Sequence, residues 1–173
     1  MTIDMTRHHG GEGTPVAECI DRHFGTWRVR TDFQPDTDEE NGVTFIEAEF
    51  PYKPSVAEVK SFVHGVTNAK TDEKILSGFV WNNKPVWLSE ENQKNFSEAQ
   101  RIAQMTEGAS LPVKFKLGED ENGEPVYHAF TTLKAITQFY TSAVAYINQC
   151  LNEGWQEKDA FDFTPYEEVL SND

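Results

Sequence analysis

The sequence predicts an α+β fold of two small lobes, each an antiparallel hairpin with helices packed on one face of a short sheet. Three observations predict it. Segments of alternating apolar and polar residues, typical of half-buried strands, occur in pairs around acidic loops. Each pair precedes a segment whose apolar residues recur at helical spacing. The order strand, acidic loop, strand, helix therefore occurs twice, which we interpret as architectural similarity between the lobes.

Composition favours a polar module that completes its burial against other proteins. The chain of 173 residues is long enough for one domain or two small lobes, but only 38% of its residues are hydrophobic, while 12% are aromatic. A net charge of −14 repels phosphate backbones, so direct binding to nucleic acid is disfavoured. No run approaches the ~18 apolar residues of a membrane span, so none is expected.

The chain begins with a polar segment, residues 1–13, that we expect to be a flexible arm without the apolar core of a signal peptide. Residues 14–25 are predicted to form a helix. Thr14 suits the N-cap, Pro15 suits the first turn, and Gly25 suits the left-handed position after the last turn.

A hairpin and a long helix are predicted next. The alternating segments 27–33 and 43–50 flank an acidic loop that ends in the turn pair Asn41-Gly42. Ser55 and Glu58 then have the spacing of a capping box, and apolar residues follow at helical spacing as far as residue 68. We expect this helix to join the two lobes.

The most distinctive stretch is a second hairpin, in which two short apolar runs flank the turn formers Asn82, Asn83 and Lys84. We expect Trp81 to lie opposite Val86. One face then carries Phe79, Trp81, Val86 and Leu88, and the other carries Val80 and Trp87. Because both faces are apolar, both need cover. The helices that follow are expected to cover the first face. The second is expected to be closed by the N-terminal lobe or to bind a partner.

The rest of the chain repeats the pattern. Ser89 is the predicted N-cap of a helix that Gly108 closes. Strands are predicted at 111–117 and 126–130, and Thr131 caps a last helix that ends at Gly154. The acidic, aromatic tail then either docks on a neighbouring subunit or packs on its own domain. The predicted parts are an arm (1–13), an N-terminal lobe (14–72), a C-terminal domain (73–155) and a tail (156–173).

Motifs of catalysis and cofactor binding are missing from the sequence. It has no phosphate loop, dinucleotide-binding glycine fingerprint, zinc-protease helix, nucleophile elbow or CxxC pair. A calcium loop with Gly42 or Gly123 at its sixth position would have alanine at its twelfth, which excludes it. Cys19 and Cys150 are expected to be buried free thiols. We therefore expect no enzyme activity, no cofactor and no metal site.

Two stretches, Lys74 to Asn82 and Val86 to Gln93, resemble an uncharacterised domain family of phages and prophages. That family occurs in and beside tail-fibre and tail-fibre-assembly proteins. Its pattern places a short G-x-x-W-N strand before a helix start, where Ser89, Glu91 and Gln93 stand here. A long closing helix, here 131–155, completes the pattern, so the resemblance covers residues 55–158. It implies a phage or prophage product that is located in the virion tail, or in the host cytoplasm during assembly.

These observations together predict a non-enzymatic, tail-associated structural adaptor or assembly protein. Its partners would be other virion or tail proteins, and it would form an oligomer or part of a larger assembly. The expected contact residues are aromatic: Phe79, Trp81, Trp87, Phe161, Phe163 and Tyr166.

Two alternatives stay open. An acidic inhibitor of a host nucleic-acid-binding defence enzyme would place the carboxylates of residues 36–40 and 119–124 on one face. A carbohydrate-binding tail module would expose Trp81 or Trp87 in a groove beside paired acids.

Overall fold

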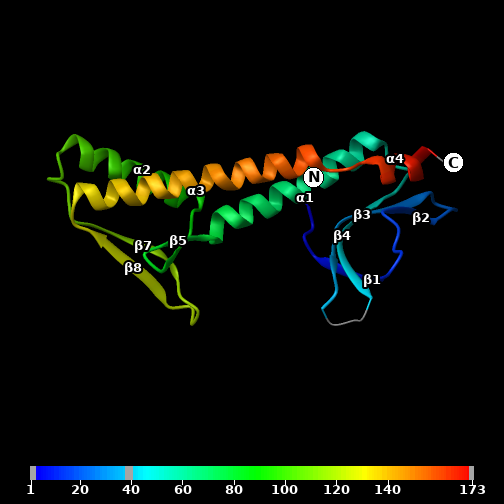
Figure 1. Cartoon of the computed structure of the whole chain (residues 1–173), viewed down its shortest axis with the longest axis horizontal. Coiled ribbons are helices and arrows are strands. Elements are labelled where there is room, and N and C mark those ends of the chain that lie inside the picture. Colours follow the sequence, from blue (N-terminus) through cyan, green and yellow to red (C-terminus); the bar gives the residue numbers. More distant parts are fainter. Residues whose placement is uncertain (1–2, 38–40, 172–173) are drawn as a thin grey trace. The chain divides into compact units, whose positions relative to one another are not determined.

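A computed structural model describes residues 3–37 and 41–171 (Figure 1) and confirms the α+β class. The chain divides into two compact units. Unit 1 is formed by residues before Lys70 and after Trp155, and unit 2 is formed by residues 70–155. The sequence placed the corresponding boundary between residues 72 and 73 and treated the tail separately.

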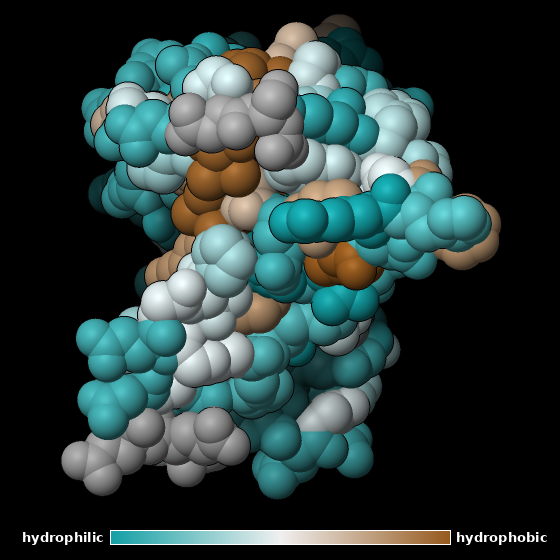
Figure 2. All heavy atoms as spheres, turned by 90° about the vertical axis from the view of Figure 1, so that its right-hand side faces the viewer, coloured by the Kyte–Doolittle hydropathy of each residue, from teal (hydrophilic) through white to brown (hydrophobic). Residues whose placement is uncertain are grey.

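Unit 1 is built on a four-stranded antiparallel sheet with the order β1-β4-β3-β2. Its strands are β1 (Arg7–Gly11), β2 (Ala17–Asp21), β3 (Thr26–Pro35) and β4 (Gly42–Phe50). The first turns of α1 (Val56–Ser77) and the short α4 (Thr164–Ser171) supply the rest of the core. The face seen in Figure 2 is mostly hydrophilic, as the acidic composition requires, with hydrophobic residues in a few small areas.

The hairpin of β3 and β4 was predicted, but the two outer strands correct the prediction. Residues 7–11 are not a flexible arm, because β1 pairs with β4. Arg7 anchors this strand: its guanidinium donates to Asp32 Oδ2 at 2.6 Å and to the carbonyls of Asp32 and Thr44 at 2.6 and 3.0 Å. These contacts are polar and join residues distant in sequence. The local pattern of apolar residues therefore does not predict strand β1.

The predicted helix over residues 14–25 is also wrong. Residues 17–21 form edge strand β2, in which Ala17 pairs with Val29 and Cys19 with Trp27. Gly25 does adopt a positive φ of 71°, but it does so in the turn between β2 and β3. A glycine that suits the end of a helix suits this turn equally well, and pairing with β3 decides between helix and strand.

Unit 2 combines two hairpins with helices. The hairpins are β5 (Phe79–Trp81) with β6 (Lys84–Val86) and β7 (Val113–Glu119) with β8 (Pro125–Phe130). The helices are α2 (Glu90–Met105) and most of α3 (Leu133–Ala160), together with the end of α1. Buried apolar residues from all of these elements form one cluster. A hydrogen bond of 2.7 Å from the Trp87 N–H to the Leu117 carbonyl links the two hairpins.

The turn between β5 and β6 corrects the predicted register. Phe79 pairs with Val86 and Trp81 pairs with Lys84, so the loop has two residues. Asn82 and Asn83 have φ angles of 49° and 60°, which is the backbone of a type I′ turn. The pairing differs from the predicted one by two residues. A shift of two leaves every side chain on the same face of the hairpin, so the two predicted faces are correct.

Helix ends were predicted well at the N-termini and poorly at the C-termini. The Ser89 hydroxyl accepts from the Asn92 N–H and caps α2 as predicted, whereas Thr132 rather than Thr131 accepts at the start of α3. Helix α1 continues from residue 68 to Ser77, and α3 runs past Gly154. A Cβ at Gly154 would lie 2.5 Å from Thr71 Oγ1, so this glycine permits close packing against α1 and does not end its helix.

The start of α1 gives a testable electrostatic prediction. Hydrogen bonds from the Ser55 N–H, from the Ser55 hydroxyl and from the Tyr52 hydroxyl lower the pKa of Glu58. A carboxylate with a lowered pKa stabilises the fold above its unfolded pKa, and this contribution disappears as the pH falls through the folded pKa. The substitution Ser55→Ala should raise the Glu58 pKa partway towards that of an ordinary glutamate. The rise is incomplete because the Ser55 N–H still donates. Titration followed by NMR measures it, with Ser55→Thr as the control, and an unchanged pKa would contradict the capping box.

Candidate functional site

Two of the six predicted contact residues belong to the cores. Phe79 is only 6% exposed in unit 2, and Tyr166 is 3% exposed in unit 1. The Tyr166 hydroxyl donates to the Arg30 carbonyl at 2.7 Å, and burial raises the pKa of this hydroxyl. Their expected role at an interface is therefore corrected, since both side chains are already occupied within the fold.

The tail aromatics Phe161 and Phe163 are partly buried in unit 1. Their rings lie 4.7 Å apart and pack beside Tyr166 at 6.0 and 6.2 Å. The Lys60 ammonium also lies 5.1 Å from the Phe163 ring. Of the two possibilities for the tail, the structure shows packing on its own unit, where the tail ends in α4.

The two hairpin tryptophans differ in exposure. Trp81 is partly buried edge-on against Phe139, at 5.6 Å between ring centroids. Its indole N–H is buried and has no hydrogen-bond partner among residues 3–37 and 41–171. Trp87 is 38% exposed, and Val80 is 60% exposed. The face with Phe79 and Val86 is therefore covered by the helices of unit 2 as predicted, and the opposite face remains open.

The open face continues onto the second hairpin. We call it the hairpin surface and define it by Val80, Pro85, Trp87, Lys114, Lys116 and Tyr127. Val80 pairs with Pro85 across β5 and β6, and Lys116 pairs with Tyr127 across β7 and β8. The Lys116 ammonium lies 5.4 Å from the Trp87 ring, and that of Lys114 lies 4.5 Å from the Tyr127 ring. These contacts make the surface continuous.

Gly118 allows the two hairpins to approach each other. A Cβ at this position would lie 3.0 Å from the Pro85 carbonyl oxygen and 3.4 Å from Trp87 Cδ1. The register of β7 and β8 also shifts between Lys116 and Gly118, which bends the strand at this point. A side chain here would push the hairpins apart and interrupt the hairpin surface.

Charges on the hairpin surface are arranged asymmetrically. Lys84 donates to the Tyr127 carbonyl at 3.1 Å, and Lys116 pairs with Glu119 at 2.7 Å. Burial and, secondarily, the charge of Lys84 lower the pKa of His128. The acidic loop at 119–124 starts three residues after Lys116. The lysines therefore lie beside the aromatic rings, and the carboxylates of the loop lie beside the β5–β6 hairpin.

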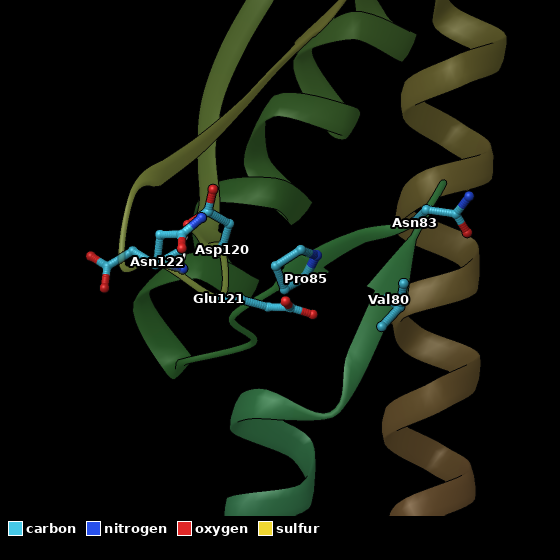
Figure 3. Close-up of a pocket in the computed structure, with 7 residues that line it drawn as sticks. Val80, Asn83, Pro85, Asp120, Glu121 and Asn122 are labelled. Carbon is cyan, nitrogen blue, oxygen red and sulfur yellow. Dashed lines mark hydrogen bonds between the residues drawn. The ribbon is translucent and has the colours of Figure 1, made fainter.

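Beside this loop is an open cavity of about 580 Å³, lined by Val80, Asn83, Pro85 and residues 119–122. Figure 3 shows Val80 and Asn83 on one side of it and Asp120 and Asn122 on the other. The Asp120 carboxylate accepts from the N–H groups of Asn122 and Glu124 at 2.9 and 3.0 Å, so it shapes the loop. The carbohydrate alternative expected Trp81 or Trp87 beside such acids, whereas Val80 and Pro85 occupy that position.

Other expected features have these positions. The acidic segments 36–40 and 119–124 belong to different units, and residues 38–40 lie outside the described residues. Cys19 and Cys150 are free, but Cys19 is only partly buried and lies on a strand. Among residues 3–37 and 41–171, no three His, Cys, Asp or Glu side chains are grouped to hold a metal ion. None of the helices in that part of the chain combines the length and apolar character needed to cross a bilayer.

Trp87 was predicted from the sequence as a contact residue, whereas Tyr127, Lys114 and Lys116 were not. Tyr127 is 49% exposed. The alternation of Lys114 and Lys116 with apolar residues was the available signal, because it places both lysines on the outer face of β7. Their proximity to Trp87 depends on how the two hairpins meet.

Comparison with known proteins gives one match. Neither a curated protein nor a solved structure matches the chain. The family described as Domain of unknown function (DUF4376) matches residues 59–173, which include all of unit 2 and the parts of unit 1 at 59–69 and 156–173. The chain therefore belongs to the family Domain of unknown function (DUF4376).

Proposed function

We propose that the protein is a non-enzymatic adaptor or assembly factor of a phage or prophage tail, and that it binds another virion or tail protein through the hairpin surface. The exposure of Val80, Trp87 and Tyr127 on one continuous face carries the proposal. The resemblance noted in the sequence supports the tail context. A location in the particle, or in the host cytoplasm during assembly, follows from the same proposal.

The physical chemistry of the hairpin surface suits protein binding. Partly exposed tryptophan and tyrosine rings supply large contact areas at low entropic cost, and such residues dominate binding energy. Lys114 and Lys116 pack over these rings and offer charges to carboxylates of a partner. Short hairpins held by a buried core present the side chains rigidly, so little ordering accompanies binding.

The function is tested with particles of the phage or prophage whose genome encodes the chain. Quantitative mass spectrometry of purified particles should find the protein at a fixed copy number, which defines a virion component. Its absence from particles, together with co-purification with a tail protein before assembly, defines an assembly factor. Association with neither particles nor tail proteins would overturn the proposal.

The substitution Trp87→Ala should weaken binding to the tail protein identified in this way by at least tenfold. The reason is that an aromatic anchor at the centre of a contact contributes well over 1 kcal/mol. Titration calorimetry measures the dissociation constant. Phe24→Ala is the matched control, because Phe24 is 73% exposed in unit 1, outside the hairpin surface. Equal affinity of Trp87→Ala and the parent protein would exclude the hairpin surface as the binding site.

A further inference from the structure

A second surface of unit 2 is unusual because it lacks charge. The 18 residues of α3 between Lys134 and Glu153 include no Asp, Glu, Lys or Arg. With 25% charged residues in the chain, about four or five would be expected there. Even the exposed positions carry only neutral side chains: Gln138, Thr141, Ala145, Asn148, Gln149 and Asn152.

A stripe of apolar residues runs along one side of this helix. Tyr140, Val144, Ile147, Leu151 and Trp155 follow one another at spacings of three or four residues, so they share one side of α3. The first four are partly buried, whereas Trp155 is 55% exposed. The sequence predicted that this helix ends at Gly154. Because α3 continues, the indole is carried outward instead.

Helix α2 covers only the first part of the stripe. The Tyr140 hydroxyl contacts Ser97 of α2 at 3.4 Å, and the Phe96 ring lies 4.9 Å from Phe139. Near the start of α2 the two helices enclose a largely apolar groove of about 260 Å³, with Gln93 and Lys94 in its lining. It is lined by Leu88, Gln93, Lys94, Phe96, Tyr140, Ala143, Val144 and Ile147. Leu151 and Trp155 lie on α3 beyond this groove, and Figure 1 shows α2 beside the earlier part of α3 only.

We propose that the α3 stripe binds a second copy of this chain, with the Trp155 indole of each copy inserted into the α2–α3 groove of the other. Trp155 is eight residues beyond Ile147, or about 12 Å along the helix. Two copies can pack with their α3 helices antiparallel about a two-fold axis that passes between Ile147 and Trp155. The indole of each copy then reaches the groove of the other copy. A two-fold interface uses the same surface on both subunits, so both contacts form twice.

Charge identifies the occupant as a second copy. Two chains of net charge −14 repel each other, and they approach at least cost where both surfaces are neutral. Side chains that lie on a two-fold axis face their own copies, so a charge on the axis would meet a like charge. The axis between Ile147 and Trp155 falls near Leu151, inside the uncharged stretch 135–152, which meets this requirement. The hairpin surface, which carries Lys114 and Lys116, does not.

Sedimentation of the full chain over a range of concentrations tests the inference. We expect a reversible dimer whose dissociation constant falls as salt is raised, because salt screens the repulsion between the copies and leaves the neutral contact intact. Trp155→Ala should raise that constant at least about thirtyfold, and Trp155→Glu should abolish the dimer. Phe24→Ala, at another exposed aromatic residue, should leave it unchanged. Circular dichroism checks that each variant is folded.

Cross-linking locates the contact. A photo-reactive phenylalanine at position 155, in a mixture of ¹⁴N- and ¹⁵N-labelled chains, should join one isotopic copy to the 88–96 or 140–147 peptide of the other. A protein that is monomeric at all concentrations would overturn the inference. So would a dimer that survives Trp155→Glu, or one that is abolished by Trp87→Ala instead. Cross-links confined to a single copy would overturn it as well.

Discussion

Replacing Phe139 by alanine is expected to lower the free energy of unfolding of unit 2 by about 3–5 kcal/mol. Phe139 is fully buried, and its ring contacts four other aromatic rings. The centroid distances are 4.8 Å to Phe130, 4.9 Å to Phe96, 5.6 Å to Trp81 and 6.2 Å to Phe79. Removal of the ring costs its burial and leaves a cavity that residues on several elements cannot all close.

Urea unfolding measures this loss, and amide hydrogen exchange assigns it to unit 2, since the amides of α2 and α3 should exchange faster. Phe139→Leu is the graded control and should lose less, because it keeps most of the volume. Phe24→Ala, on an exposed turn of unit 1, should change stability by less than about 0.5 kcal/mol. A loss below about 1 kcal/mol for Phe139→Ala would mean that the aromatic cluster is not the centre of this core.

Replacing Arg30 by methionine is expected to lower the free energy of unfolding of unit 1 by about 3 kcal/mol or more. The Arg30 side chain is only 6% exposed. Its guanidinium donates to Glu47 at 3.0 Å, to Glu18 at 2.6 Å and to the Pro15 carbonyl at 3.0 Å. Methionine fills the space but leaves the Glu47 carboxylate, itself 11% exposed, without its closest cation.

Two further variants separate the lost pair from lost packing. Arg28→Met removes a more exposed arginine, 37% accessible, that lies farther from Glu47, at 3.5 Å, and should cost no more than about 1 kcal/mol. Adding Glu47→Leu to Arg30→Met should recover stability, because an apolar pair replaces a buried carboxylate that has lost its closest cation. If the double variant is less stable than Arg30→Met, the carboxylate is not the source of the loss. Urea unfolding with exchange rates for β3 and β4 reports each case.

The two surfaces of unit 2 should respond to salt in opposite directions. A tail protein that presents carboxylates to Lys114 and Lys116 should bind more weakly as ionic strength rises. Self-association through the uncharged part of α3 should strengthen under the same change, since only the repulsion between the acidic copies is screened. One salt series, followed by calorimetry and by sedimentation, therefore tests both assignments and keeps them separate.

Several features of this fold were readable from the sequence because their causes are local. The capping box at Ser55 and Glu58 and the N-cap at Ser89 form with near neighbours in the chain. The strands at 26–35 and 42–50 alternate because one face of a sheet is buried, and that period is written directly in the residue order. The absence of charged residues along most of α3 is likewise visible in the sequence. So are the apolar residues on both faces of the β5–β6 hairpin.

Tertiary structure decided what local patterns leave open. Strand β1 forms because it pairs with β4 and because Arg7 reaches Asp32 and Thr44, 25 and 37 residues away. Strand β2 forms because it pairs with β3. The hairpin surface exists because Gly118 lets two hairpins meet, which places Lys116 over Trp87. The α3 stripe becomes a candidate contact only because α2 begins too late to cover Trp155. The sequence determines the periodicity of apolar residues and the residues that cap helices. Strand pairing and side-chain exposure depend on which distant segments come into contact.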